Sequence, residues 1–243
     1  MSTTPIALHA VNQQLQHYFA AHPQAGEGLV TVLEDSLSLP RLLPLLQALL
    51  ADADSLQAVA ARSYVHGNGF VKVVLLDEHG HKLRLHIWFA GSACEENIHD
   101  HRWSFASHVL VGTLNSEIWV DDAQGQALPE YRYAAATATA AADKQALGTC
   151  RVSLQQHCQY GAGSSYVMPK QVLHRIINPG QRLVATIMVS APTEQGDTRL
   201  IPMQEQLNPQ VDMPRLSAAV LAPLLRRFVA ECQAQTWERS QAA

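Results

Sequence analysis

Two histidines separated by one residue, His99 and His101, are the first candidates for chemistry in this sequence. They lie in residues 97–112, NIHDHRWSFASHVLVG, a stretch rich in residues that favour a strand. Alternate strand residues point to the same face, with Cα atoms roughly 6.5–7 Å apart. Two imidazoles on one face can therefore reach the same metal ion. Asp100 would point away from that ion and could act as a supporting group.

A third histidine, His174, lies in a second apolar stretch, residues 163–178, which also has the composition of a strand. Pro169 and the glycines at 161 and 163 indicate turns just before it. Taken alone, one histidine on an apolar strand is more often a buried structural residue than a metal ligand. Its interpretation therefore depends on how the two stretches combine.

The two stretches together resemble the two signature motifs of the cupin superfamily. The second family motif is G-x5-P-x-G-x2-H-x3-N, and it is matched at the family spacing by Gly163, Pro169, His174 and Asn178. Gln171 stands where the motif usually has its inner glycine. The combined spacing of both motifs is far more specific than either piece alone.

The first family motif is G-x5-H-x-H-x3,4-E-x6-G, and it is matched by His99, His101 and Gly112. Ala93 takes the place of the leading glycine, and Phe105 stands where the glutamate is expected. In strand parity Phe105 shares a face with the two histidines, so its ring should replace the carboxylate inside the barrel. A phenyl ring cannot coordinate a metal.

The resemblance, without the glutamate, implies a metal site of three neutral imidazoles from His99, His101 and His174. Nitrogen ligands suit Fe, Zn, Cu or Ni. Three protein ligands leave positions open for water, substrate or dioxygen, which is typical of a catalytic site. Because the ligands are neutral, a divalent ion would keep its full charge and favour an anionic or chelating substrate.

Among cupins, a metal site of three histidines, two of them from an IHDH sequence, is found in the cysteine dioxygenase group and its thiol dioxygenase relatives. The stretch LRLHIWFAGSACEENIHDH is similar to that group's approach to the metal, and ARSYVHGNGF resembles the segment whose arginine holds the substrate carboxylate. The resemblance implies Arg62 as the carboxylate clamp. Arg84, in a strand nearer to the histidines, is the alternative.

The outer part of the site departs from that group. Ala185, Ile187 and Val189 occupy the positions of its Ser-x-His-x-Tyr set, and the cysteine that some members link to the tyrosine has no counterpart. The resemblance therefore covers the metal site but not the cysteine chemistry. Asp100 or backbone carbonyls should orient the ligand histidines, and Asn178 belongs to the same supporting set.

Aromatic residues are expected beside the metal, because Trp103 and Phe105 share the parity of His101. They would exclude water and shape an apolar pocket with few polar anchors. On residues 83–89, Arg84, His86 and Trp88 share one face. If that face lines the barrel they join the pocket, and otherwise they are surface residues; the sequence leaves both alternatives open.

The elements that must position these residues are mainly strands. Residues 5–60 have a helical pattern, strands begin at about residue 64, and residues 214–236 form an amphipathic pattern. The turn DEHGH, with His79 and His81, is expected to be exposed, and the Ala-rich residues 133–142 are expected in a loop or weak edge strand. DDAQG is expected to turn the strand before it.

The predicted fold is mainly β: a cupin jelly-roll barrel with N-terminal helices and a C-terminal helix. We expect one domain over residues 1–243. Residues 1–61 would form a helical cap, residues 62–192 the barrel, and residues 193–243 a final strand and helix.

Composition narrows the functional classes. A net charge of −4 without a Lys/Arg cluster argues against nucleic-acid or membrane-surface binding. Four scattered cysteines without a C-x-x-C pair suit a reducing compartment. No signal peptide or transmembrane run is evident, so a cytoplasmic location is expected.

The sequence thus predicts a mononuclear non-haem Fe(II) oxygenase or dioxygenase acting on a small polar molecule, with a carboxylate or thiol as candidate groups. Ni, Mn, Zn or Cu are the other candidate ions. Alternatives are a metal-dependent cupin isomerase, lyase or decarboxylase, and a non-catalytic small-molecule-binding cupin. The expected partners are the substrate and dioxygen, and the expected assembly is a monomer or homodimer.

Overall fold

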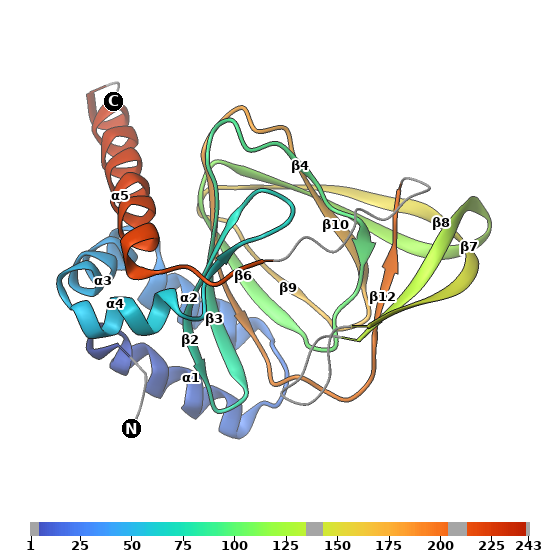
Figure 1. Ribbon diagram of the computed structural model, residues 1–243, viewed down its shortest axis with the longest axis horizontal. Helices are drawn as coiled ribbons and strands as arrows, with labels where there is room; N and C mark the ends of the chain where they lie inside the picture. The colour runs from blue at the N-terminus through green and yellow to red at the C-terminus, as the bar shows by residue number, and fades with distance from the viewer. Residues whose placement is uncertain (1–4, 135–142, 204–212, 242–243) are drawn as a thin grey trace.

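The computed structural model describes residues 5–134, 143–203 and 213–241, and in it the helices lie on one side of a β-barrel (Figure 1). The N-terminal helices are η1 (Ile6–Leu8), α1 (His9–Ala21), α2 (Glu27–Leu37), α3 (Leu39–Ala51) and α4 (Ala53–Ala60). The C-terminal helix is α5 (Ala218–Gln241). No single described helix is long and apolar enough to cross a membrane; α3 and α4 qualify only as a pair, and that pair is bent by 104°.

The described strands form two antiparallel six-stranded sheets. The first has the order β1 (Tyr64–Val65), β2 (Val71–Glu78), β3 (His81–Trp88), β11 (Val184–Ser190), β6 (Phe105–Val111) and β9 (Ser165–Met168). The second has the order β4 (Cys94–Glu95), β10 (Leu173–Asn178), β5 (Ile98–His99), β12 (Thr198–Ile201), β7 (Thr113–Ala134) and β8 (Asp143–Gly161). In addition, β10 pairs directly with β7.

The strand order is that of a jelly roll. From β3 onward the chain passes repeatedly between the sheets, and β11, the last strand of the first sheet, returns to lie between β3 and β6. In the second sheet β10 returns between β4 and β7, while β7 and β8 form a long hairpin. This double-sheet antiparallel arrangement confirms the predicted fold class. The division at residues 61 and 192 stays a prediction.

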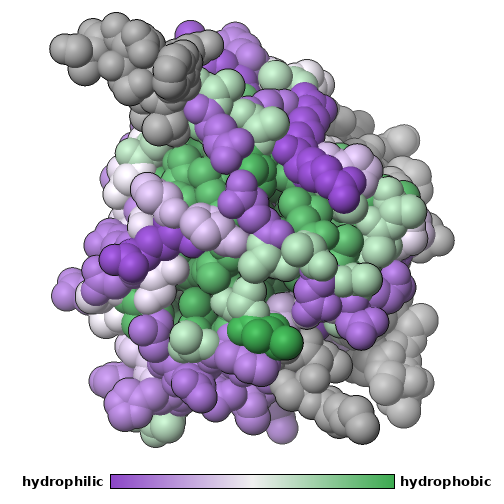
Figure 2. All heavy atoms as spheres, turned by 90° about the vertical axis from the view of Figure 1, so that its left-hand side faces the viewer, coloured by the Kyte–Doolittle hydropathy of each residue, from purple (hydrophilic) through white to green (hydrophobic). Residues whose placement is uncertain are grey.

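The helices cover the outer face of the first sheet and bury one large apolar core against it. Leu15 of α1, Leu33 of α2 and Phe228 of α5 pack with Leu85 and Ile187 of the sheet. Because strand residues alternate between faces, the residues between these positions point into the barrel. Figure 2 shows the helix-covered side, where hydrophobic side chains are visible between hydrophilic ones.

This packing resolves the open orientation of β3. Leu83, Leu85 and Ile87 face the helices, so Arg84, His86 and Trp88 face the barrel interior. Trp88 indeed packs against Ile176 and Leu114 of the second sheet. These contacts place the Arg84 face between the two sheets.

Two local expectations need correction, and a third lies largely outside the described residues. Residues 97–112 are not one strand, because the chain leaves the second sheet after His99 and enters the first at Phe105. DDAQG does not turn its strand; β7 continues to Ala134 past a bulge between Asp121 and Gln126. The Ala-rich segment falls largely outside the described residues: β7 includes residues 133 and 134, and residues 135–142 are not described.

His81 is a further correction, because it is 0% exposed rather than lying free in the hairpin turn. Its ring stacks on Phe19 of α1, with centroids 5.2 Å apart, so the N-terminal helices cover this end of the hairpin. Neither ring nitrogen has a hydrogen-bond partner among the described residues. His79, by contrast, is exposed.

Burial of His81 predicts a loss of stability in acid. Desolvation lowers the pKa of this imidazole below its ordinary 6.5, although Glu78 and Asp77 oppose the shift. The unfolded chain therefore takes up this proton first, so the contribution is fully present above about pH 6.5 and lost as pH falls toward the folded pKa. His81→Leu should flatten the slope of unfolding free energy below pH 6.5 by up to about 1 kcal/mol per pH unit. Urea titrations from pH 7 to 5 measure this, with exposed His17→Leu as the control; parallel slopes for wild type and His81→Leu would refute it.

Gly112, the last residue of the first motif, is required by backbone geometry. Its φ is 76°, and a Cβ there would lie 2.5 Å from the carbonyl oxygen of Leu183. Gly91 has a similar φ of 93° but nothing within 4 Å of the corresponding position. Gly112→Ala should therefore cost about 2 kcal/mol more than Gly91→Ala, because it adds a backbone collision to the strain. Urea midpoints compare the two variants, and equal losses would contradict the collision.

Candidate metal centre

Three imidazoles converge inside the barrel. His99, His101 and His174 each offer one ring nitrogen, and these atoms lie within 4.8 Å of one another. The ring centroids are 4.7 to 5.1 Å apart. His174 on β10 pairs directly with His99 on β5, so the sheet register itself brings the two sequence motifs together. A single ion at the centre of this group would be within reach of all three side chains.

Backbone carbonyls fix two of the three rings. Nδ1 of His99 lies 2.9 Å from the carbonyl oxygen of Asn97, and Nδ1 of His174 lies 2.8 Å from that of Val172. A carbonyl oxygen only accepts hydrogen bonds, so Nδ1 carries the proton in the neutral ring. Nε2 is then left with its lone pair free for a metal, which is the usual support of a histidine ligand.

The environment keeps the imidazoles of His101 and His174 uncharged. Burial is the main cause that lowers the pKa of His174 to about 3, and the neighbouring His99 contributes. Burial, then His99 and His174, also hold the pKa of His101 well below 6.5. A neutral imidazole is the form that binds a metal, so no proton has to leave these two rings at neutral pH.

Two aromatic rings border the cluster. The Phe105 ring lies 5.7 Å from the His101 ring and 5.9 Å from the His174 ring, so a phenyl group stands beside the imidazoles. Trp103 stacks on His101, with centroids 4.8 Å apart and planes 14° apart. Met168 and Met188 pack behind Phe105. The wall beside the imidazoles is therefore apolar, and Phe105 supplies no fourth protein ligand.

The two expected supporting side chains have other roles. Asp100 accepts a hydrogen bond of 2.7 Å from the backbone nitrogen of Arg199, which fastens β12 next to β5. Asn178 accepts from the backbone nitrogen of Gly180 and donates to the carbonyl oxygen of Ser92, closing the turn after β10. Neither bonds to a ligand histidine, so the backbone carbonyls alone take the orienting role.

Arg62 makes its described hydrogen bonds away from the histidines. Its guanidinium donates to the carbonyl oxygens of Val74 and Leu75 where β2 is irregular. These hydrogen bonds join the end of α4 to the sheet, and the role of Arg62 as carboxylate clamp stays a prediction. Arg84, the alternative, faces the barrel. Trp88 also faces inward, but it packs in an apolar cluster with Phe70, and in the described part of the chain its ring contacts none of the three clustered histidines.

Sequence reasoning missed two residues that face the same interior. Lys72 on β2 pairs with His86 on β3, and Tyr64 on β1 pairs with Lys72, so all three share the inner face. The signal was present in the sequence, because a lysine inside the otherwise apolar run VKVVLL is unusual for a buried strand. The strand that pairs with β2 had to be known before the face of the Lys72 side chain could be assigned.

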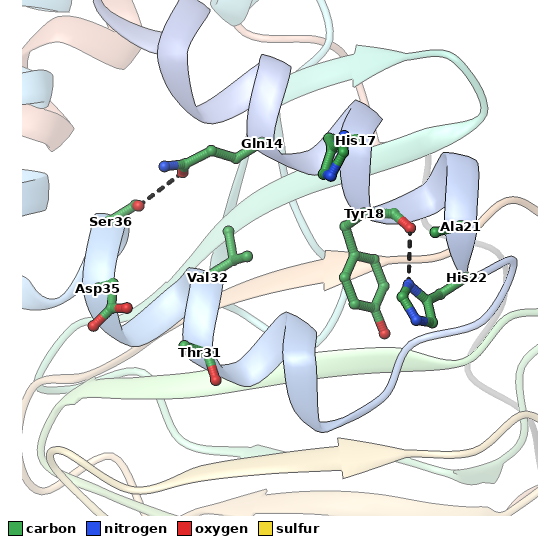
Figure 3. A pocket seen from close by; sticks show the side chains of 9 residues that line it. All are labelled: Gln14, His17, Tyr18, Ala21, His22, Thr31, Val32, Asp35 and Ser36. Carbon is green, nitrogen blue, oxygen red and sulfur yellow. Dashed lines mark hydrogen bonds between the residues drawn. The ribbon is translucent and has the colours of Figure 1, made fainter.

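A second concave region lies outside the barrel, between α1 and α2 (Figure 3). This hollow of about 300 Å³ is lined by residues that include His17, His22 and Asp35. Figure 3 shows polar groups already engaged locally: Ser36 donates to Gln14, and Nδ1 of His22 contacts a backbone oxygen. It has no group of converging metal ligands among the described residues, so the barrel interior is the better candidate site.

No protein-family model matches the chain, and no curated protein matches it. Similar solved structures include an RmlC-like cupin from Shewanella frigidimarina, at 18% identity over 56% of this chain and 86% of that one, with a TM-score of 0.34. A mutant oxalate decarboxylase from Bacillus subtilis is 12% identical over 58% of this chain and 30% of that one, with a TM-score of 0.36. A Klebsiella pneumoniae protein with a double-stranded beta-helix domain is 11% identical over 57% of this chain and 89% of that one, at 0.33. At such TM-scores the fold assignment rests on the strand order alone.

Fold and site together define a class of protein: a double-sheet jelly-roll barrel whose interior holds three histidines able to bind a metal ion.

Proposed function

We propose that the chain is a mononuclear non-haem Fe(II) oxygenase or dioxygenase acting on a small polar molecule. The observation that carries the proposal is the convergence of His99, His101 and His174 with no carboxylate in the group. Three imidazoles hold a divalent ion and leave the rest of its coordination sphere to water, substrate or dioxygen. A structural site would instead be closed by a fourth protein ligand.

The donor set fits such an ion. Two rings have Nδ1 engaged by carbonyl oxygens, so their Nε2 lone pairs are available without rearrangement. Imidazole nitrogen is a suitable ligand for Fe(II), and equally for Zn, Cu or Ni. When bound, the ion would supply a place where substrate and dioxygen are oriented and activated together.

The chain's own residues would position the substrate and restrict solvent. Phe105 and Trp103 border His101 with apolar surface, which would limit the access of water to the ion. The carbonyl of Val172 holds the ring of His174 in one orientation, so the ligands need not reorganise during turnover. Dioxygen and a small-molecule substrate are the proposed partners of a cytoplasmic monomer or homodimer.

The experiment begins with protein purified without oxygen and loaded with Fe(II). Elemental analysis gives the metal content, and an oxygen electrode then records uptake with a panel of small carboxylates, amino acids and thiols. Substrate-dependent oxygen uptake that requires iron supports the proposal. Conversion of a substrate without oxygen uptake would replace it with a Lewis-acid reaction, and weak substoichiometric metal would replace it with a binding protein.

A further inference from the structure

Lys72 on β2 is a lysine whose side chain faces the inside of the barrel. Its sequence neighbours Val71 and Val73 pack against the helices, so Lys72 points to the opposite face of the sheet. His86 on β3 lies directly opposite, with its side chain on the same inner face. Lysine ordinarily lies at the protein surface, where water solvates its charge, so the chemistry of this position differs from that of an ordinary lysine.

The groups around Lys72 are aromatic and cationic more than acidic. Its Nζ atom lies 5.4 Å from the ring centre of Tyr64 and 5.4 Å from that of Phe70. Nζ is hydrogen-bonded to the Tyr64 hydroxyl, while the guanidinium of Arg84 on the adjacent strand repels its charge. Glu96 attracts that charge, but within the described ranges no carboxylate oxygen lies within the ion-pair distance of 4.0 Å. The ammonium form is therefore stabilised less than in an ordinary ion pair.

Two other lysines, with partly exposed side chains, show the ordinary arrangement. Lys82 forms an ion pair with Asp77, and Lys170 forms one with Glu194. A carboxylate partner favours the protonated form of a lysine, which is a hydrogen-bond donor but not a nucleophile. Lys72 has a phenol in the place of that carboxylate.

Burial and a second cation favour the neutral amine of Lys72. Burial is the main cause that lowers the pKa of its ammonium group, and the charge of Arg84 lowers it further, against opposing effects of Tyr64 and Glu96. Burial raises the pKa of Tyr64, but the charges of Lys72, Arg84 and Arg215 outweigh burial and leave that pKa below its ordinary value. A desolvated lysine beside another cation is an activated nucleophile. A phenol that releases its proton more easily is a better acid toward a neighbouring group.

The inner face around Lys72 has room for a polar molecule. Lys72, Tyr64 and Arg84 are half-buried, so the barrel interior keeps solvent-accessible surface at this point. His86, directly across from Lys72, has its Nε2 atom buried without a hydrogen-bond partner among the described residues. A hydroxyl or carbonyl group of a molecule bound beside Lys72 would provide the partner that this nitrogen lacks.

We propose that Lys72 is a nucleophile that binds a small aldehyde or ketone covalently, as an iminium ion, inside the barrel. The neutral amine adds to the carbonyl carbon, and one amine proton passes to the carbonyl oxygen to give a carbinolamine. Tyr64 then donates its proton to the departing hydroxyl, which leaves as water while the C=N bond forms. The products are the iminium ion, water and the Tyr64 phenolate, so no oxidant or reductant is needed. The site uses neither the three histidines nor a metal, and it goes beyond the proposed function without depending on it.

Reductive trapping with dihydroxyacetone, a small uncharged ketone, tests the proposal on the full chain. Cyanoborohydride reduces the iminium ion to a stable secondary amine, and peptide mass spectrometry locates the modified lysine among Lys72, Lys82, Lys144 and Lys170. Lys72 should be modified at least about 10-fold faster than each of the others, because each unit by which the pKa falls gives about tenfold more neutral amine near neutral pH. Glycerol, which has the same carbon skeleton without the carbonyl group, should give no adduct. EDTA is present throughout, so the result is independent of the proposed iron site.

Substitutions identify the groups that take part. Lys72→Met should abolish the fast adduct, and Lys72→Arg should do the same while it keeps a cation at this position. Tyr64→Phe should slow trapping about 100-fold, the lower end of the range for general acid catalysis. Lys82→Met is the matched control, since Lys82 is paired with Asp77, and it should be trapped at the rate of wild type. Thermal melts establish that each variant is folded.

Three results would overturn the assignment of Lys72. They are the absence of an adduct in wild type, adducts spread evenly over the lysines, and equal incorporation of dihydroxyacetone by wild type and Lys72→Met. Unchanged trapping in a folded Tyr64→Phe variant would overturn the assignment of Tyr64 as the proton donor.

Discussion

Replacing His101 or His174 with alanine is expected to reduce bound iron from a stoichiometric amount to background. Each ring supplies one of three nitrogens that lie within 4.8 Å of one another. In the described part of the chain no acidic or cysteine side chain joins this group as a fourth ligand. Two imidazoles hold a divalent ion far less tightly than three, because the lost nitrogen is replaced only by water. The measurement is elemental analysis after anaerobic loading with Fe(II) and gel filtration.

Exposed His17 supplies the control, since His17→Ala removes an imidazole on α1, outside the barrel. A second readout is thermal stability, because an ion that binds only the folded state raises the melting temperature as its concentration rises. Wild type and His17→Ala should show this rise, and the two ligand variants should not. Full iron content in both His101→Ala and His174→Ala would end the metal assignment.

The histidine cluster could be expected from sequence because its geometry is largely local. His99 and His101 are separated by one residue, so extended backbone places both on one side whatever the remaining fold. His174 was brought in by the resemblance of the second motif, and the register of β10 with β5 shows why that motif lies opposite the first. Phe105 faced inward as parity indicated, although the chain changes sheets before reaching it.

The residues around the cluster could not be assigned in the same way, because their partners are distant in the sequence. Asp100 bonds to the backbone of Arg199, and Arg62 to carbonyls of the irregular part of β2. Each carries the right chemical group for a site, but a nearer backbone acceptor or donor engages it. Lys72 shows the opposite case, a residue type that usually lies on the surface but here faces the interior. It does so because its neighbours on β2 pack against the helices.

We expect the largest loss of stability from breaking the buried ion pair between Arg175 on β10 and Glu117 on β7. Arg175, 8% exposed, donates through Nε to Glu117, which is 4% exposed. Glu117 also accepts a hydrogen bond of 3.0 Å from Nε1 of Trp119. Arg175→Met would leave the carboxylate without its guanidinium, with only Trp119 and the exposed His157 beside it, and breaking one side of a buried pair costs about 3–5 kcal/mol. Urea denaturation at neutral pH measures the loss.

The double variant Glu117→Leu/Arg175→Met separates the value of the pair from the penalty of breaking it. Removing both charges also removes the desolvation cost of both, so the double variant should recover most of the stability lost by Arg175→Met. If it is as unstable as the single variant, the pair contributes through packing on Trp119 rather than through charge. His174 directly precedes Arg175 in the sequence, but its side chain lies on the opposite face of β10 and its ring is held by the carbonyl of Val172. Iron loading should therefore be the same in the double variant as in wild type, since the pair supports the sheet behind the site and leaves the ligand ring in place.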